Sequence, residues 1–188
     1  MIFWLAMAAG LLVQWGRGGR LGALGDVRFR CWGLPVAGGA LHGLLRLWRG
    51  PIPGTDVEMA ASLAVYACLG LFLALNLRLP GAPLVLAGMS SNCLATLAAG
   101  GRMPVWIATT GRLPAGVSSA LRRGALASHV LIPHPSGLGW LGDVLAIPRP
   151  LPADVVSAGD LAIAAGILLF LALATPDARL AARRRPSS

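Results

Sequence analysis

Long apolar stretches are the feature that most constrains the fold of this chain. Four are clear and a fifth is weaker, and short arginine-bearing segments separate most of them. An apolar helix needs about 20 residues to cross a bilayer. The pattern predicts an all-α membrane protein, a small bundle of about five transmembrane helices, at residues 1–15, 32–48, 56–77, 83–99 and 158–174.

Composition supports the same prediction and argues against nucleic acid as a partner. Hydrophobic residues make up 56% and charged residues 12% of the chain, and the mean hydropathy is +0.71. A soluble domain usually has about 25% charged residues. The net charge of +9 comes from arginines that lie between the apolar stretches, not from a basic face with interleaved aromatic residues. We therefore expect membrane lipids as partners, with another membrane protein as a further candidate.

The chain is long enough for one domain, which we place at residues 1–176, followed by a basic tail at 177–188. Cytoplasmic loops of membrane proteins carry an excess of arginine and lysine. Arginines concentrate after the first stretch, after the third and in the tail. This predicts a multi-pass protein of the cell membrane, with its N-terminus outside and its C-terminus in the cytoplasm.

Local signals refine the boundaries of these stretches. Thr55 and Glu58 have the spacing of a capping box at the start of the third stretch, which gives Glu58 a structural role. Ser157 and Asp160 form a second such pair before the fifth stretch. The second stretch contains a proline and several glycines, so it could span the membrane or re-enter on the same side. Residues 100–156 lack a run long enough to cross, and we expect a long, proline-rich, partly interfacial external loop.

Two polar residues lie near the middle of apolar stretches, His42 in the second and Asn92 in the fourth. Polar groups at such positions need hydrogen-bond partners. Asn92 lies on a stripe of small or polar residues at helical spacing, which favours close helix packing with interhelical hydrogen bonds; the other members are Gly88, Ser91, Ala95 and Thr96. For His42 a structural role and a place on a proton or substrate path both remain open.

Four charged or titratable residues outside these stretches form a candidate external-rim site: Arg102, His129, Asp143 and Asp160. We predict that Arg102 lies within ion-pair reach of Asp143 or Asp160. The spacing of the histidines and aspartates matches no metal-ligand motif, and no nucleophile elbow, phosphate loop or dinucleotide fingerprint occurs. We therefore expect no metal and no cofactor, and the catalytic residues, if any, stay unknown.

Several short motifs follow one another along the chain: Leu79-Pro80-Gly81, Gly100-Gly101-Arg102-Met103-Pro104-Val105, His129-Val130-Leu131, Leu141-Gly142-Asp143-Val144 with Pro148 and Pro150, and Ser157-Ala158-Gly159-Asp160. In this order they resemble an uncharacterised bacterial integral-membrane family known only as a domain of unknown function. That family's usual N-G-G-x-M-P begins with Ala99 here, which puts in doubt any role that needs the asparagine amide. The resemblance implies a bacterial cytoplasmic-membrane protein and supplies no activity.

Three functions remain open at this point. The first is a binding or transport module for a lipid or lipid-linked ligand, which a deep cavity lined by His42 or Asn92 would favour. The second is an accessory or scaffold subunit of a larger membrane complex, which an uncovered apolar face would favour. The third is a membrane enzyme that acts on a lipid headgroup, which requires His129 to converge with Asp143 and Asp160.

Overall fold

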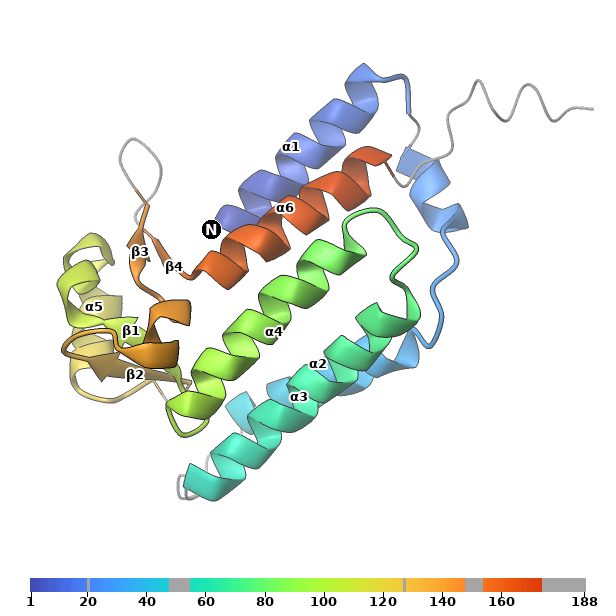
Figure 1. The fold of residues 1–188 in the computed structure, drawn as a ribbon. Coiled ribbons are helices and arrows are strands. Elements are labelled where there is room, and N and C mark those ends of the chain that lie inside the picture. Colours follow the sequence, from blue (N-terminus) through green and yellow to red (C-terminus); the bar gives the residue numbers. More distant parts are fainter. Residues whose placement is uncertain (20, 48–54, 127, 148–153, 174–188) are drawn as a thin grey trace, which may run out of the picture.

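The computed structural model describes the chain except for residues 20, 48–54, 127, 148–153 and 174–188. The side chains of His42, Thr55 and Glu58 and the tail at 177–188 lie outside the described part, so the predictions made for them stay untested. Five long helices form most of the molecule (Figure 1): α1 (Ile2–Gly16), α2 (Gly33–Leu47), α3 (Thr55–Leu75), α4 (Ala82–Ala98) and α6 (Ala158–Leu173).

The five apolar stretches are helices, and each predicted boundary lies within two residues of the observed one. Local signals account for this agreement. Pro83 occupies the first turn of α4, where its missing N–H costs nothing, and Gly100 and Gly101 follow the helix with positive φ angles of 70° and 91°. The sequence therefore predicts the positions of the long helices correctly.

The membrane assignment of these helices is wrong. Among the described residues, no helix combines the length and the apolar character that crossing a membrane requires. Helices α1, α2, α4 and α6 have 15 to 17 residues, which corresponds to about 23–26 Å, against roughly 30 Å for a hydrocarbon core. The predicted bundle of about five transmembrane helices, the multi-pass location in the cell membrane and the outside orientation of the N-terminus are corrected accordingly.

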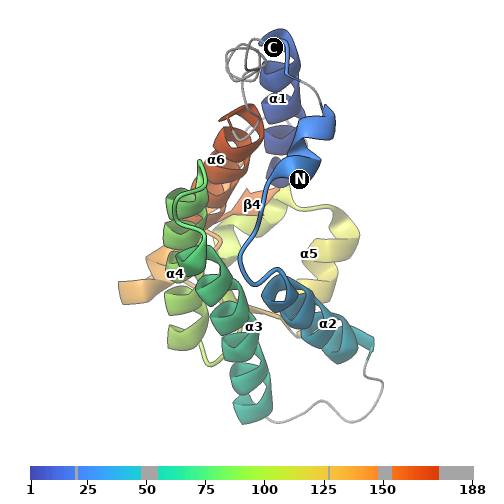
Figure 2. The ribbon, with the colours of Figure 1, turned by 90° about the vertical axis from the view of Figure 1, so that its right-hand side faces the viewer.

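The long helices lie side by side in the order α1, α6, α4, α3, α2 (Figures 1 and 2). The first and last long helices are therefore neighbours, although the whole chain separates them. Neighbouring long helices approach one another closely at glycine positions. A Cβ atom on Gly10 would lie 2.8 Å from Cβ of Leu171, and one on Gly159 would lie 2.6 Å from the carbonyl oxygen of Gly88. Glycine permits this approach because it has no side chain.

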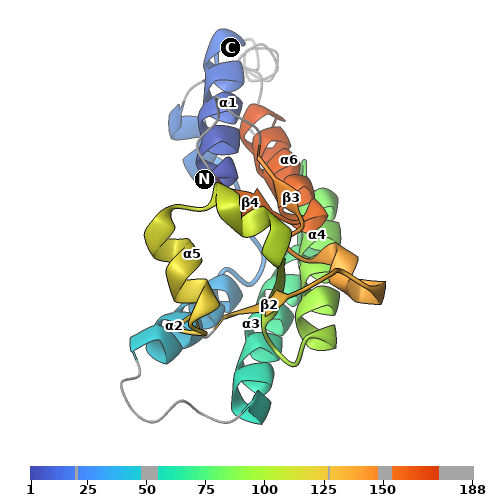
Figure 3. The ribbon, with the colours of Figure 1, turned by 90° about the vertical axis from the view of Figure 1, so that its left-hand side faces the viewer.

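The described residues between 100 and 156 form a small α/β layer, where the sequence predicts a long, proline-rich, partly interfacial external loop. Strands β1 (Met103–Trp106) and β2 (His129–Ile132) pair in parallel, and a bridge between Val105 and Asp143 extends the ladder. Two short strands, β3 (Leu145–Ala146) and β4 (Val155–Val156), pair antiparallel. Three short helices complete the layer: η2 (Ile107–Arg112), α5 (Ala115–Arg122) and η3 (Gly137–Leu141). The layer stands in front of the row of long helices in Figure 3. A further short helix, η1 (Leu21–Asp26), follows α1 and does not belong to the layer.

Candidate functional site

A closed set of hydrogen bonds joins the middle of α4 to the start of α6. The Ser157 hydroxyl accepts a bond from the backbone N–H of Asp160 at 2.9 Å, and the Asp160 carboxylate accepts one from the N–H of Ser157 at 3.2 Å. This is the predicted capping box. The Asn92 amide completes the set, since its NH₂ donates to Asp160 and its oxygen accepts from the Ser157 hydroxyl, both at 2.8 Å. Asn92 and Ser157 are buried, so these bonds replace water for both.

The titratable pair of His129 and Asp143 lies next to this set, on the α/β layer. The backbone of Asp143 bonds to one edge of β1, before and after Val105: its N–H donates to Pro104 at 2.8 Å, and its carbonyl accepts from Trp106 at 3.1 Å. This pairing brings the Asp143 carboxylate to 3.8 Å from Nε2 of His129 on β2. The distance allows an ion pair but exceeds that of a hydrogen bond.

The environment of Asp143 disfavours its charge. Burial, followed by the nearby carboxylates of Asp160 and Asp154, raises the pKa of Asp143 to about 7. A carboxyl group with a pKa near neutral pH can either give or take a proton, which is the property that general acid–base groups need. The ion pair expected between Arg102 and Asp143 or Asp160 stays a prediction.

Tyr66 on α3 adds a third helix to the same region. Its hydroxyl lies 3.4 Å from Oγ1 of Thr96, which also donates to the sulfur of Met103 at 3.6 Å. Burial raises the pKa of Tyr66, the hydrogen bond with Thr96 opposes this, and the carboxylates of Asp160 and Asp143 add to the rise. We call this region the polar centre; its members are Tyr66, Asn92, Thr96, His129, Asp143, Ser157 and Asp160.

The polar centre brings together residues that the sequence singles out and one residue that it does not. Asn92, His129, Asp143 and Asp160 gather there, whereas Tyr66 escapes sequence analysis because it reads as one more large residue in an apolar run. The signal that could have found Tyr66 is that it is the chain's single tyrosine. Among the described residues, no group of three or more side chains of metal-binding type is placed to hold an ion.

A second candidate site lies on α1, the helix that packs against α6 at one edge of the helix row. The buried residues of this helix are Ala6, Gly10 and Gln14, which are four positions apart and form one narrow stripe. Most of the other side chains of the helix are also apolar, and many of them are exposed: Trp4 is 72%, and Trp15 77%, accessible. Further exposed apolar side chains on the helix are Leu5, Met7, Leu12 and Val13. We call these six residues the α1 face.

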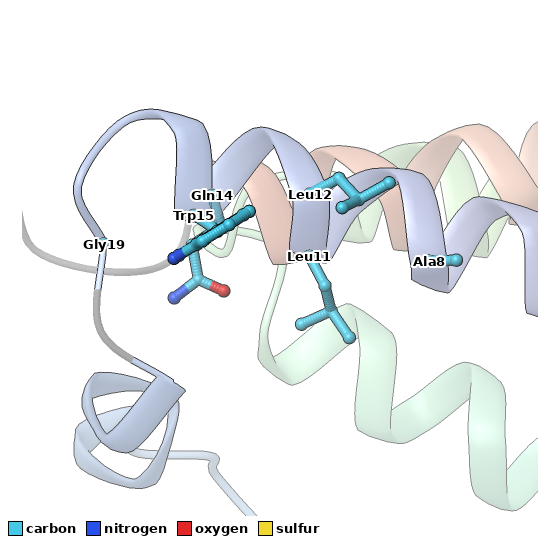
Figure 4. Close-up of a pocket in the computed structure, with 6 residues that line it drawn as sticks. All are labelled: Ala8, Leu11, Leu12, Gln14, Trp15 and Gly19. Carbon is cyan, nitrogen blue, oxygen red and sulfur yellow. The ribbon is translucent and has the colours of Figure 1, made fainter.

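A pocket of about 420 Å³ opens beside the α1 face. Its lining comes from α1 and the turn that follows the helix (Figure 4), and it is apolar apart from the Gln14 amide. Neither Asn92 nor any other member of the polar centre contributes to it. The lining residues are Ala8, Leu11, Leu12, Gln14, Trp15 and Gly19.

Comparison with known proteins assigns most of the chain to one family. The family described as "Family of unknown function (DUF5317)" matches residues 53–172, well over half of the sequence. The chain belongs to this family. The expected likeness to an uncharacterised domain is thus confirmed, and DUF5317 carries no described activity. The polar centre lies inside the segment that matches DUF5317, and α1 lies outside it. No curated protein and no solved structure matches the chain.

Proposed function

We propose that the protein is an accessory subunit that binds another protein through the α1 face. The observation that supports this proposal is the one-sided burial of α1. A helix that is hydrophobic around its whole circumference is normally covered on all sides, and a contiguous exposed apolar patch typically marks an interaction surface. Only the stripe of Ala6, Gly10 and Gln14 is buried, so the other sides of this helix require a cover.

The shape of the surface favours an apolar helix as the partner element. Trp4 and Trp15 are separated by eleven positions, about 17 Å along the helix axis, so the face extends over three turns. Tryptophan is enriched among residues that dominate binding energy at protein interfaces. The pocket beside Leu12 has room for a bulky apolar side chain, as in complexes where an amphipathic helix lies in a groove.

Two other functions have less support from the described residues. A binding or transport module for a lipid or lipid-linked ligand would be favoured by a cavity lined by His42 or Asn92. The Asn92 amide is hydrogen-bonded to Asp160 and Ser157 and joins α4 to α6. An enzyme called for His129 to meet both Asp143 and Asp160. His129 lies near Asp143, but Asp160 is engaged by Asn92 and by the backbone of Ser157.

Site-specific photo-crosslinking tests the proposal in the native cell. A photoreactive amino acid at Leu12, which is 63% exposed, should yield a discrete adduct with one protein, identified by mass spectrometry. The matched control carries the same amino acid at Leu138, which is 47% exposed and belongs to the α/β layer. Adding Trp15→Glu to the Leu12 probe should abolish the adduct without changing the helix content measured by circular dichroism.

Two results would overturn the proposal. One is an adduct of the Leu12 probe with a small apolar molecule and no protein, which would identify the α1 face as a ligand site. The other is an equal pattern of adducts from the Leu12 and Leu138 probes, or an adduct that survives Trp15→Glu. Either pattern would mean that exposed apolar residues crosslink without a specific partner.

A further inference from the structure

Three aromatic rings meet on the α/β layer, away from both sites described above. Trp106 ends β1, His134 follows β2, and Trp140 belongs to η3. The ring centroid of Trp106 lies 6.0 Å from that of His134 and 6.4 Å from that of Trp140. The centroids of His134 and Trp140 are 6.1 Å apart. Three separate segments therefore bring their rings to the corners of a nearly equilateral triangle. We call this the aromatic triad.

The aromatic triad lies on the outer side of the strands. Successive residues of a strand point to opposite sides, and Val105 is 3% exposed whereas Trp106 is half-buried. His134 and Trp140 are exposed, Trp140 to 52%. Asp143 is the bridge partner of Val105 and therefore points to the same side of the ladder as Val105, opposite to the Trp106 ring. The triad is therefore reached from solvent and is separate from the polar centre.

Hydrogen bonds hold two of the rings by their edges. The indole N–H of Trp106 donates to the carbonyl oxygen of Pro133 at 3.2 Å. Nδ1 of His134 lies 2.9 Å from the carbonyl oxygen of Pro135, and a carbonyl can only accept, so Nδ1 carries the proton. Both bonds lie in the planes of the rings, where such donors point. These two hydrogen bonds therefore fix the orientations of the Trp106 and His134 rings without engaging their π faces.

We propose that the aromatic triad binds an organic cation of the quaternary ammonium class. The face of an aromatic ring carries negative electrostatic potential, tryptophan the most, and rings grouped around one point recognise such cations. The ring planes are inclined to one another by 64°, 61° and 89°. Steeply inclined walls surround a compact, nearly spherical group, whereas a flat sugar ring needs one broad platform.

The net charge of the protein determines how the affinity for a cation should depend on ionic strength. The chain carries a net charge of +9 and repels a cation at long range. Affinity must therefore come from short-range contact with the rings, in which the cation exchanges water for π faces. Added salt screens the repulsion, so the affinity for a cation at the triad should hold or rise with ionic strength. Binding to exposed carboxylates would weaken under the same conditions.

Calorimetric titration of the full chain with choline tests the proposal, with 3,3-dimethylbutan-1-ol as the uncharged isostere of the same shape. Choline should bind and the alcohol should bind about tenfold more weakly or not at all, because only the charge differs. Trp140→Ala should weaken choline binding by about tenfold, and Trp140→Phe should retain part of it. Trp32→Ala is the matched control, since Trp32 is 69% exposed and lies outside the α/β layer.

Each alternative outcome would overturn this assignment. Equal affinity for choline and its isostere would indicate an apolar patch without cation recognition. An equal loss in Trp32→Ala would indicate non-specific contact with exposed indoles. Binding of a methyl pyranoside in place of choline would make the triad a sugar platform, and no heat with choline in the intact chain would reject the site altogether. His134→Ala provides a second truncation at an exposed position, so the test does not depend on one variant.

Discussion

The carboxylate of Asp143 lies 3.8 Å from Nε2 of His129, on two segments that the chain separates by thirteen residues and the β1 ladder brings together. The Asp143 side chain is 12% exposed and that of His129 is 35% exposed. The carboxylate is therefore largely shielded from water. This relationship makes the stability of the α/β layer depend on pH.

The first prediction concerns Asp143→Asn. Because the pKa of Asp143 rises from 3.8 to about 7 on folding, the folded state holds this proton more tightly than the unfolded state. The resulting stabilisation is fully present below pH 3.8 and is lost as the pH rises to about 7. Each pKa unit corresponds to about 1.4 kcal/mol. The free energy of unfolding of the wild type should thus fall by a few kcal/mol over this range relative to the variant, as measured by urea denaturation.

The variant His129→Gln distinguishes the effect of burial on the ionisation of Asp143 from the effect of the ion pair with His129. If the imidazolium helps to stabilise the ionised carboxylate, the pH dependence should become steeper when the imidazole is removed. A wild-type curve that runs parallel to that of Asp143→Asn at every pH would show that the carboxyl titrates normally in the folded protein.

The second prediction concerns Asn92→Leu. Leucine fills a similar space but leaves the Ser157 O–H without its acceptor and Oδ1 of Asp160 without its donor. Each buried group that loses its hydrogen bond costs about 1–3 kcal/mol, so the free energy of unfolding should fall by roughly 2–5 kcal/mol. Ser90→Leu, at an exposed position of the same helix, should change it by no more than about 0.5 kcal/mol. Similar effects of the two substitutions would contradict the structural role of the Asn92 amide.

Local patterns account for what the sequence predicts well. Apolar runs, Pro83 at a helix start and the Ser157–Asp160 box are each contained within a few residues, so the helix bounds follow from the sequence. Asn92 stands out because one polar side chain in a small-residue stripe needs a partner on a neighbouring helix. Its link to Asp160 then joins two residues that were singled out separately.

The parts that sequence analysis missed depend on long-range pairing or on geometry. Run length shows that a segment is apolar, but not what covers it, and this is why helices of 15 to 17 residues were assigned to a membrane. The α/β layer depends on the pairing of Met103 with His129 across an intervening helix. The same strand pairing brings His129 close to Asp143 and the Trp106 ring close to those of His134 and Trp140. Neither group of residues can therefore be recognised from a short stretch of the sequence.

The last prediction compares two glycines in helices. A Cβ atom on Gly159 would collide with the Asn92 amide oxygen and lie 2.6 Å from the carbonyl oxygen of Gly88, whereas one on Gly70 of α3 meets nothing within 4 Å. Gly159→Ala should therefore push α6 away from α4 and lower the free energy of unfolding by about 1–3 kcal/mol, as overpacking does. Gly70→Ala should raise it by up to about 1 kcal/mol, because alanine favours the helix more than glycine does. Thermal unfolding monitored by circular dichroism gives both signs, and chemical shifts of the Asn92 side-chain NH₂ should move in Gly159→Ala alone. Stabilisation by both substitutions would show that α4 and α6 are not in close contact at Gly159.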